Sequence, residues 1–127
     1  NWQLESKDFS IALHKFLNSN LLSSIYIIGQ EPLLFESPIR SIRFSHINLP
    51  SKVEVNKNYL RTNQVLKEIA NQYEWVTYLD FSQLPIFQTV PVYNGEVIYR
   101  DNHHIHSIAA IEYAKQALPI FVDKVFK

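Results

Sequence analysis

The densest cluster of ionisable side chains in the sequence lies between Tyr99 and His106. Within this cluster, Asp101 and His104 stand three residues apart. In a turn that enters a helix, this spacing can bring the carboxylate against the imidazole Nδ1–H while Nε2 points outward. The carboxylate then fixes the tautomer, and the free nitrogen can take a proton from a serine hydroxyl during acyl transfer. The spacing therefore allows His104 to act as a general base with Asp101 as its orienting acid.

Two other interpretations apply to the same cluster. An Asp and a His near a helix N-terminus are commonly a cap and a solvated neighbour, and the local pattern alone favours that interpretation. His103, His104 and His106 with Asp101 also offer imidazole and carboxylate groups that suit Zn²⁺ or Ni²⁺. Because adjacent side chains diverge on a strand or a helix, His103 and His104 are not expected to converge on one ion. A metal site is the weaker alternative.

The chain before this cluster alternates between helical and strand patterns. Apolar residues at helical spacing over residues 6–17 predict an amphipathic helix, which residues 18–20 close. Residues 24–29 predict a strand buried on both faces in a parallel sheet. A second helix is expected from about residue 53 to residue 74, followed by a second buried strand at residues 75–79. Helices alternating with buried strands indicate an α/β fold.

Residues 30–52 are expected to form an extended surface excursion, because prolines prevent long regular elements there: Pro32, Pro38 and Pro50. Arg40 and Arg43 are candidates for binding an anionic group, although solvated loop charges are the commoner case. The serines of this stretch are interpreted as turn or solvent-facing residues, not as substitute nucleophiles for His104: Ser37, Ser41 and Ser45.

A hairpin and a third helix are expected to flank the candidate pair. The dipeptide Asn94-Gly95 predicts a two-residue hairpin, because both positions accept positive φ. Apolar residues at helical spacing from Ile108 to Leu118 predict a helix that Pro119 kinks or restarts. The pair would thus lie at a junction between two elements, where functional sites are often built.

The composition excludes several function classes. Twelve Lys and Arg balance 12 Asp and Glu over 127 residues, so no net charge draws nucleic acid or an anionic membrane. Cysteine is absent, which removes disulfides, thiolate catalysis and Cys-ligated zinc. No apolar run approaches the roughly 20 residues that span a bilayer, and the N-terminus has no basic segment followed by an apolar one. A soluble segment is expected, with residues 1–127 forming one domain or part of one.

Residues 91–105, PVYNGEVIYRDNHHI, resemble the last motif block of the SGNH domains fused to acyltransferase-3 membrane proteins. In those domains a Val-rich hairpin precedes Asp-x-x-His and a helix. Residues 25–32, IYIIGQEP, are similar to the family's strand-plus-proline segment, and residues 76–80, VTYLD, to its next strand. This resemblance, which covers most of the chain, implies the C-terminal portion of a flavodoxin-like SGNH three-layer α/β sandwich, with a small hairpin before the catalytic loop.

Carried over by position, the resemblance implies that Asp101 is the triad acid and His104 the triad base, and it assigns no role to His103 or His106. It also implies a serine in a Gly-Asp-Ser block near the start of the domain, which this sequence lacks. The two glycines are expected to end a strand and to form the hairpin, so none remains for a nucleophile turn or an oxyanion donor. We expect a chain truncated at its N-terminal side, with fewer strands than the full sheet.

The implied activity is transfer or hydrolysis of an O-acyl group, foremost acetyl, on a cell-envelope polysaccharide acceptor. The acyl donor would come from the membrane acyltransferase portion of the parent protein, with the domain on the periplasmic or outer face of the bacterial inner membrane. No metal or organic cofactor is required. This segment alone is expected to be inactive, because the serine is missing. Exposed sheet edges would also allow two copies to pair as a homodimer.

The alternative is a non-enzymatic binding or structural module whose site has decayed. Three departures from the family pattern motivate it. Ala109 stands where the family usually has glycine, His106 stands where it often has serine, and residues 85–90 lack the cysteines seen in many relatives.

Overall fold

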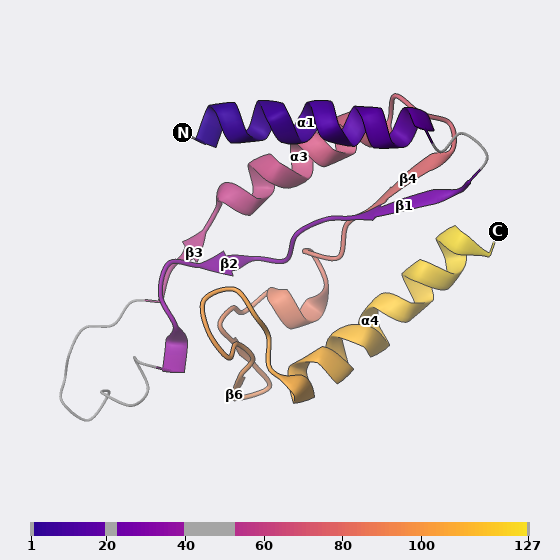
Figure 1. Cartoon of the computed structure of the whole chain (residues 1–127). Helices are drawn as coiled ribbons and strands as arrows, with labels where there is room; N and C mark the ends of the chain where they lie inside the picture. The colour runs from indigo at the N-terminus through magenta and orange to yellow at the C-terminus, as the bar shows by residue number, and fades with distance from the viewer. Residues whose placement is uncertain (1, 20–22, 40–52, 127) are drawn as a thin grey trace.

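The computed structural model describes residues 2–19, 23–39 and 53–126, with side chains of the first helix described from Lys7 onward. Five residues discussed above lie outside the described residues: Arg40, Ser41, Arg43, Ser45 and Pro50. The chain is a small α/β domain (Figure 1). Its elements, in order, are α1 (Trp2–Ser19), β1 (Ile25–Ile28), β2 (Leu33–Leu34), β3 (Val55–Asn56), α3 (Asn58–Ala70), β4 (Val76–Leu79), η2 (Pro85–Phe87), β5 (Val92–Tyr93), β6 (Glu96–Val97) and α4 (Ser107–Val125).

A parallel ladder between β1 and β4 lies at the centre of the fold. Its register pairs Ile25 with Val76 and Ile28 with Leu79. Backbone hydrogen bonds extend it at both ends, from the Ile25 N–H to the Trp75 carbonyl and from the Gly29 N–H to the Leu79 carbonyl. The predicted parallel pairing is therefore present, as a two-stranded sheet.

Alternate side chains of the ladder enter two separate apolar clusters, one on each face. Ile25 and Ile27 pack in a cluster with Leu17 of α1 and Ile69 of α3. Tyr26 packs in the other cluster, which contains buried side chains of α4 and of the segment that follows β4. Because successive strand residues point to opposite faces, α1 and α3 cover one face of the sheet and α4 the other (Figure 1).

The prediction that β1 is buried on both faces is wrong. Ile28 is 51% exposed, and the other three residues of the strand are only half-buried. A strand of a parallel sheet is fully buried when it has a neighbour on each edge and helices over both faces. Among the described residues, β1 has a neighbouring strand on its β4 edge alone.

The helices lie close to their predicted positions, but α1 extends from Trp2 to Ser19 rather than over residues 6–17, and α3 ends at Ala70 rather than near residue 74. α3 begins at Asn58, not near residue 53, because Val55 and Asn56 pair antiparallel with Leu34 and Leu33. α4 continues through Pro119 without a restart. Pro119 is exposed, so the carbonyl that loses its helical hydrogen bond one turn earlier can be satisfied by water.

The hairpin prediction is confirmed. β5 and β6 pair antiparallel around Asn94 and Gly95, whose φ angles are 50° and 81°. Positive φ at both positions is what a two-residue turn matching the strand twist requires.

Gly29 directly follows β1 and lies close to side chains of α3 and β4. A Cβ at this position would collide with the Tyr78 hydroxyl oxygen and would lie 3.2 Å from Asn63 Cγ. Asn63 cannot easily retreat, because its amide group accepts from the Gln30 N–H at 2.6 Å and donates to the Gln30 carbonyl at 2.9 Å. Gly29 thus allows the ladder to end against this asparagine.

Gly29→Ala is expected to lower the free energy of unfolding by about 1–3 kcal/mol, as overpacking does in a filled site. Urea unfolding followed by circular dichroism would measure the change. In a Tyr78→Phe background the loss should shrink, because the colliding oxygen is gone. An equal loss in both backgrounds would show that this hydroxyl is not the obstacle.

Candidate functional site

The cluster of ionisable residues lies on a closed loop before α4. An antiparallel bridge joins Tyr99 to Ile105, and the Arg100 N–H donates to the His104 carbonyl at 2.8 Å inside it. The His106 N–H donates to the Ile98 carbonyl at 3.0 Å and completes the closure. These bonds hold residues 100–104 in a compact turn.

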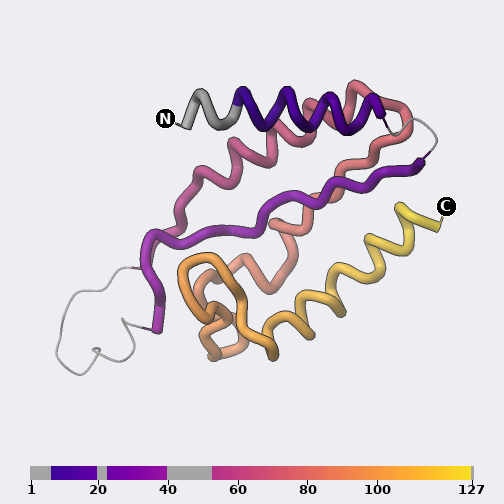
Figure 2. The backbone as a smooth tube through the Cα atoms, viewed as in Figure 1, coloured from indigo at the N-terminus to yellow at the C-terminus, as the bar shows by residue number. Residues whose placement is uncertain are grey.

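Two contacts attach this loop to the segment that follows β1. The hydroxyl of the buried Tyr99 donates to the Pro32 carbonyl, and the Leu34 N–H donates to the Asn102 carbonyl at 3.0 Å. Figure 2 shows the loop beside this segment, beyond the carboxyl end of β1. In open α/β sheets, ligands bind outside the carboxyl ends of the strands. The loop therefore lies at the end of the sheet where such folds place their binding sites.

Asp101 and His104 are in direct contact, as the spacing predicted. His104 Nδ1 lies 2.9 Å from Asp101 Oδ2 and 3.1 Å from Oδ1. With the proton on Nδ1, the imidazole donates to the carboxylate and leaves Nε2 with a lone pair. No hydrogen bond to Nε2 comes from any residue that the structure describes. This is the arrangement of a base held by an acid.

The carboxylate of Asp101 is also held by the backbone. Its Oδ1 accepts from the N–H groups of His103 and His104, both at 2.7 Å. The His103 N–H, the His104 side chain and the His104 N–H together hold the pKa of Asp101 well below its usual range. The acid is thus ionised at neutral pH and oriented independently of its contact with the imidazole.

The pair faces solvent. The side chain of His104 is 67% exposed and that of Asp101 is 37% exposed. The Arg100 Nε lies 3.9 Å from Asp101 Oδ2, with its own side chain 69% exposed. The charge attraction between such exposed side chains contributes little to stability, so the backbone N–H groups of His103 and His104 are the main restraint on the carboxylate. The geometry that matters here is the orientation of the imidazole.

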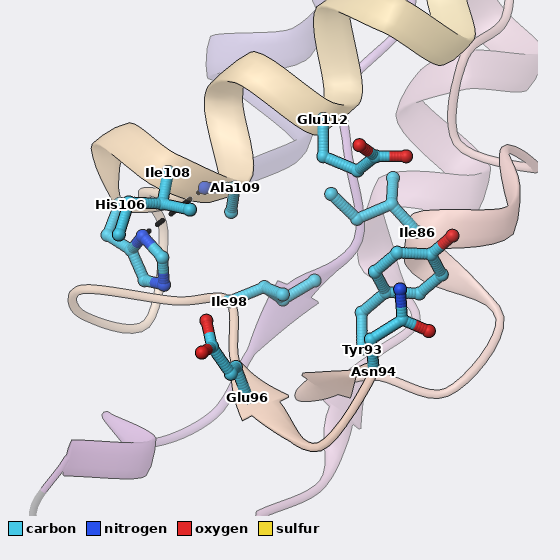
Figure 3. Close-up of a pocket in the computed structure, with 9 residues that line it drawn as sticks. All are labelled: Ile86, Tyr93, Asn94, Glu96, Ile98, His106, Ile108, Ala109 and Glu112. Carbon is cyan, nitrogen blue, oxygen red and sulfur yellow. Dashed lines mark hydrogen bonds between the residues drawn. The ribbon is translucent and has the colours of Figure 1, made fainter.

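His106, to which the sequence assigned no role, is a structural residue. Its Nε2–H donates to the Val97 carbonyl at 2.7 Å, and its Nδ1 accepts from the Ala109 N–H at 3.3 Å. Figure 3 shows this second bond, which caps the N-terminus of α4. Both ring nitrogens are therefore engaged. Histidine is not among the preferred N-cap residues, so the local sequence carried no signal for this role.

A cleft of about 250 Å³ lies between the hairpin and the first turns of α4, and His106 forms part of its wall (Figure 3). Asp101 and His104 do not line it. Nine residues do: Ile86, Tyr93, Asn94, Glu96, Ile98, His106, Ile108, Ala109 and Glu112. The Gln116 amide nitrogen donates to the Tyr93 hydroxyl at 3.1 Å and to Glu112 Oε1 at 3.0 Å. These bonds fix one wall of the cleft.

Other polar groups lie just beyond the carboxyl end of β4. Asp80 Oδ1 accepts from the Ser82 N–H at 2.9 Å and from the Ser82 hydroxyl at 2.7 Å. Burial, with a smaller contribution from Asp80, raises the pKa of Tyr78 to about 12. Ser82 is buried and donates its hydroxyl proton to Asp80, so its chemistry is that of a turn residue.

The remaining candidates are not brought to the pair. His103 makes no side-chain hydrogen bond to a described residue, although its ring centroid lies 6.3 Å from that of His104. Within residues 2–19, 23–39 and 53–126, no group of three or more His, Cys, Asp or Glu side chains is arranged to hold a metal ion. None of the helices in these ranges is both long and apolar enough to cross a membrane.

Comparisons of the chain with protein-family models, with curated proteins and with solved structures gave no match.

Asp101 is expected to make the stability of the chain depend on acid. Its pKa is lowered on folding from an unfolded value of about 3.9, so the stabilisation is present above that pH and is lost as pH falls through the folded value. Urea unfolding between pH 2 and pH 6 should show this loss below about pH 4. Asp101→Asn should weaken the dependence, and an unchanged profile would contradict the assignment.

His106→Ala is expected to lower the free energy of unfolding by about 0.5–2 kcal/mol, because the N-cap of α4 loses its acceptor. His106→Asn should lose less, since asparagine is among the preferred N-cap residues. Thermal unfolding of the three proteins would rank them. Equal stability of the alanine and asparagine variants would show that the cap is not the source of the effect.

Proposed function

We propose that this chain is the Asp-His-bearing part of an acyl-transfer domain of the SGNH type. The observation that carries this proposal is the contact between His104 Nδ1 and Asp101 Oδ2 at 2.9 Å, on a loop fixed beyond the carboxyl end of β1. The α/β arrangement with helices on both faces of a parallel pair is compatible with a flavodoxin-like three-layer sandwich of which these are the later elements.

The chemistry follows from the free Nε2 of His104. In the proposed reaction, Nε2 takes the proton of a serine hydroxyl as the serine oxygen attacks an acyl carbonyl. The imidazolium, which Asp101 stabilises, then gives that proton to the leaving group. A sugar hydroxyl or water afterwards attacks the acyl-serine and restores both residues. The resemblance assigns the serine to a Gly-Asp-Ser block, which the sequence of this chain does not contain.

The proposed substrates follow from the resemblance of residues 91–105 to domains fused to acyltransferase-3 proteins. The group transferred is an O-acyl group, foremost acetyl, and the acceptor is a cell-envelope polysaccharide. The acyl donor is supplied by a membrane acyltransferase portion, which would place the domain on the periplasmic or outer face of a bacterial inner membrane.

The catalytic proposal is tested in a polypeptide extended by the residues encoded upstream, with an aryl acetate as substrate. His104→Ala and Asp101→Asn are each expected to lower kcat/KM by about 10³–10⁴-fold, because the serine loses its base or the base loses its orientation. His103→Ala is the matched control, since its side chain does not hold the pair. The 127-residue chain alone should show no His104-dependent hydrolysis.

The second candidate is a binding or structural module with a decayed site. It is favoured by the absence of a serine against Nε2 among the described residues and by the structural use of His106, which stands where the family often has serine. Unchanged activity in both the His104→Ala and Asp101→Asn variants of the extended polypeptide would establish it in place of the catalytic proposal.

A further inference from the structure

The cleft between the hairpin and α4 is separate from the candidate pair and has an apolar floor. Three of its lining side chains belong to the buried core: Ile86, Ile98 and Ala109. Ile108, on the first turn of α4, lines the same cleft and is 66% exposed. Burial of apolar surface is favourable in proportion to the area removed from water. The cleft can therefore hold the alkyl part of a ligand.

The charged groups that line the cleft are all negative. Glu96 lies on β6 and Glu112 on α4, and none of the nine lining residues is Lys or Arg. His106 adds no positive charge in this arrangement, because its Nδ1 accepts from the Ala109 N–H and its proton lies on Nε2. A cleft whose charges share one sign concentrates the field and attracts the opposite charge. The lining therefore favours a cation.

Both carboxylates keep an oxygen available to a ligand. Glu112 Oε1 accepts from the Gln116 amide, whereas Oε2 lies 3.9 Å from Lys115 Nζ, beyond hydrogen-bonding distance. The Lys115 side chain is 71% exposed, so solvent weakens its attraction for Glu112. No hydrogen bond or ion pair reaches the Glu96 carboxylate from the part of the chain that the structure describes. A cation can approach both carboxylates without displacing a strong contact.

Other kinds of occupant fit these groups less well. Figure 3 shows the carboxylates of Glu96 and Glu112 on opposite sides of the Ile98 side chain, whereas a metal ion needs several ligands that converge on it. Among the described residues, no set of three His, Cys, Asp or Glu side chains is arranged to hold one. An anion would be repelled, and a wholly apolar ligand would take carboxylates out of water without giving them a partner. An amphipathic cation matches both the floor and the walls.

The size of the cleft limits the size of the ligand. Its volume of about 250 Å³ is below the roughly 300–1,000 Å³ of pockets that enclose drug-sized molecules. The occupant is therefore comparable to one long side chain, with an unbranched apolar stem and a single charged end.

We infer that the cleft binds an aliphatic ammonium ion, whose alkyl chain lies on the apolar floor and whose charged end is stabilised by the carboxylates of Glu96 and Glu112. A lysine side chain of a partner peptide and a free linear amine both present this chemistry. The site does not depend on the proposed acyl transfer, since neither Asp101 nor His104 lines it.

Titration of the 127-residue chain, followed by the amide NMR signals of Gly95 and Ala109, provides the test. The probes are n-pentylamine and Nα-acetyl-lysine amide, which are both protonated at neutral pH because a lysine ammonium has a pKa of about 10.4. The matched neutral control, n-pentanol, should bind at least about fivefold more weakly, since it lacks the charge. Tighter binding of Nα-acetyl-lysine amide than of n-pentylamine would identify a peptide as the source, and the reverse order a free amine.

Variants of the carboxylates complete the test. Glu96→Gln and Glu112→Gln together should weaken binding of n-pentylamine by about fivefold or more, whereas Glu68→Gln, which removes an exposed carboxylate of α3, should not. Glu96→Gln alone, at an exposed hairpin position, should show part of this loss, so the result does not depend on α4 remaining intact. Equal affinity for n-pentylamine and n-pentanol, or unchanged affinity in the folded double variant, would overturn the inference. A titration in which neither amine shifts the amides of the cleft would do the same.

Discussion

The parallel register of β1 and β4 is the constraint on which the rest of the structure depends. Pairing Ile25 with Val76 sends Ile25 and Ile27 toward α1 and α3 and leaves Tyr26 for α4. A slip of one residue would exchange the two faces and place each side chain in the wrong cluster. Among the described residues, the β1–β4 ladder is the sheet whose side chains enter both clusters, so it positions both helical layers.

Two long-range hydrogen bonds fix the position of the candidate site relative to the ladder. Pro32 and Leu34 follow β1 in the chain. The Pro32 carbonyl accepts from the Tyr99 hydroxyl, and the Leu34 N–H donates to the Asn102 carbonyl. The buried Tyr99 makes this connection rigid, since its ring fills the core while its hydroxyl is satisfied. The turn that contains Asp101 and His104 is held by its own residues, because the His103 and His104 N–H groups donate to the Asp101 carboxylate.

One edge of the sheet and one ring nitrogen of the candidate pair have no partner among the described residues. The loop presents an oriented base whose Nε2 has no hydrogen-bond partner among the described residues. The outer edge of β1 has no neighbouring strand among the described residues.

Some features could be predicted from the sequence because they depend on residues close together in the chain. Asn94 and Gly95 determine the hairpin through their own backbone freedom, and the spacing of Asp101 and His104 sets their contact within one turn. Helical periodicity located α1, α3 and α4 to within a few residues. The limited burial of β1, the N-cap role of His106 and the anchoring of Tyr99 were decided only by tertiary structure. Each of these depends on which distant element lies opposite the residue, and local spacing does not contain that information.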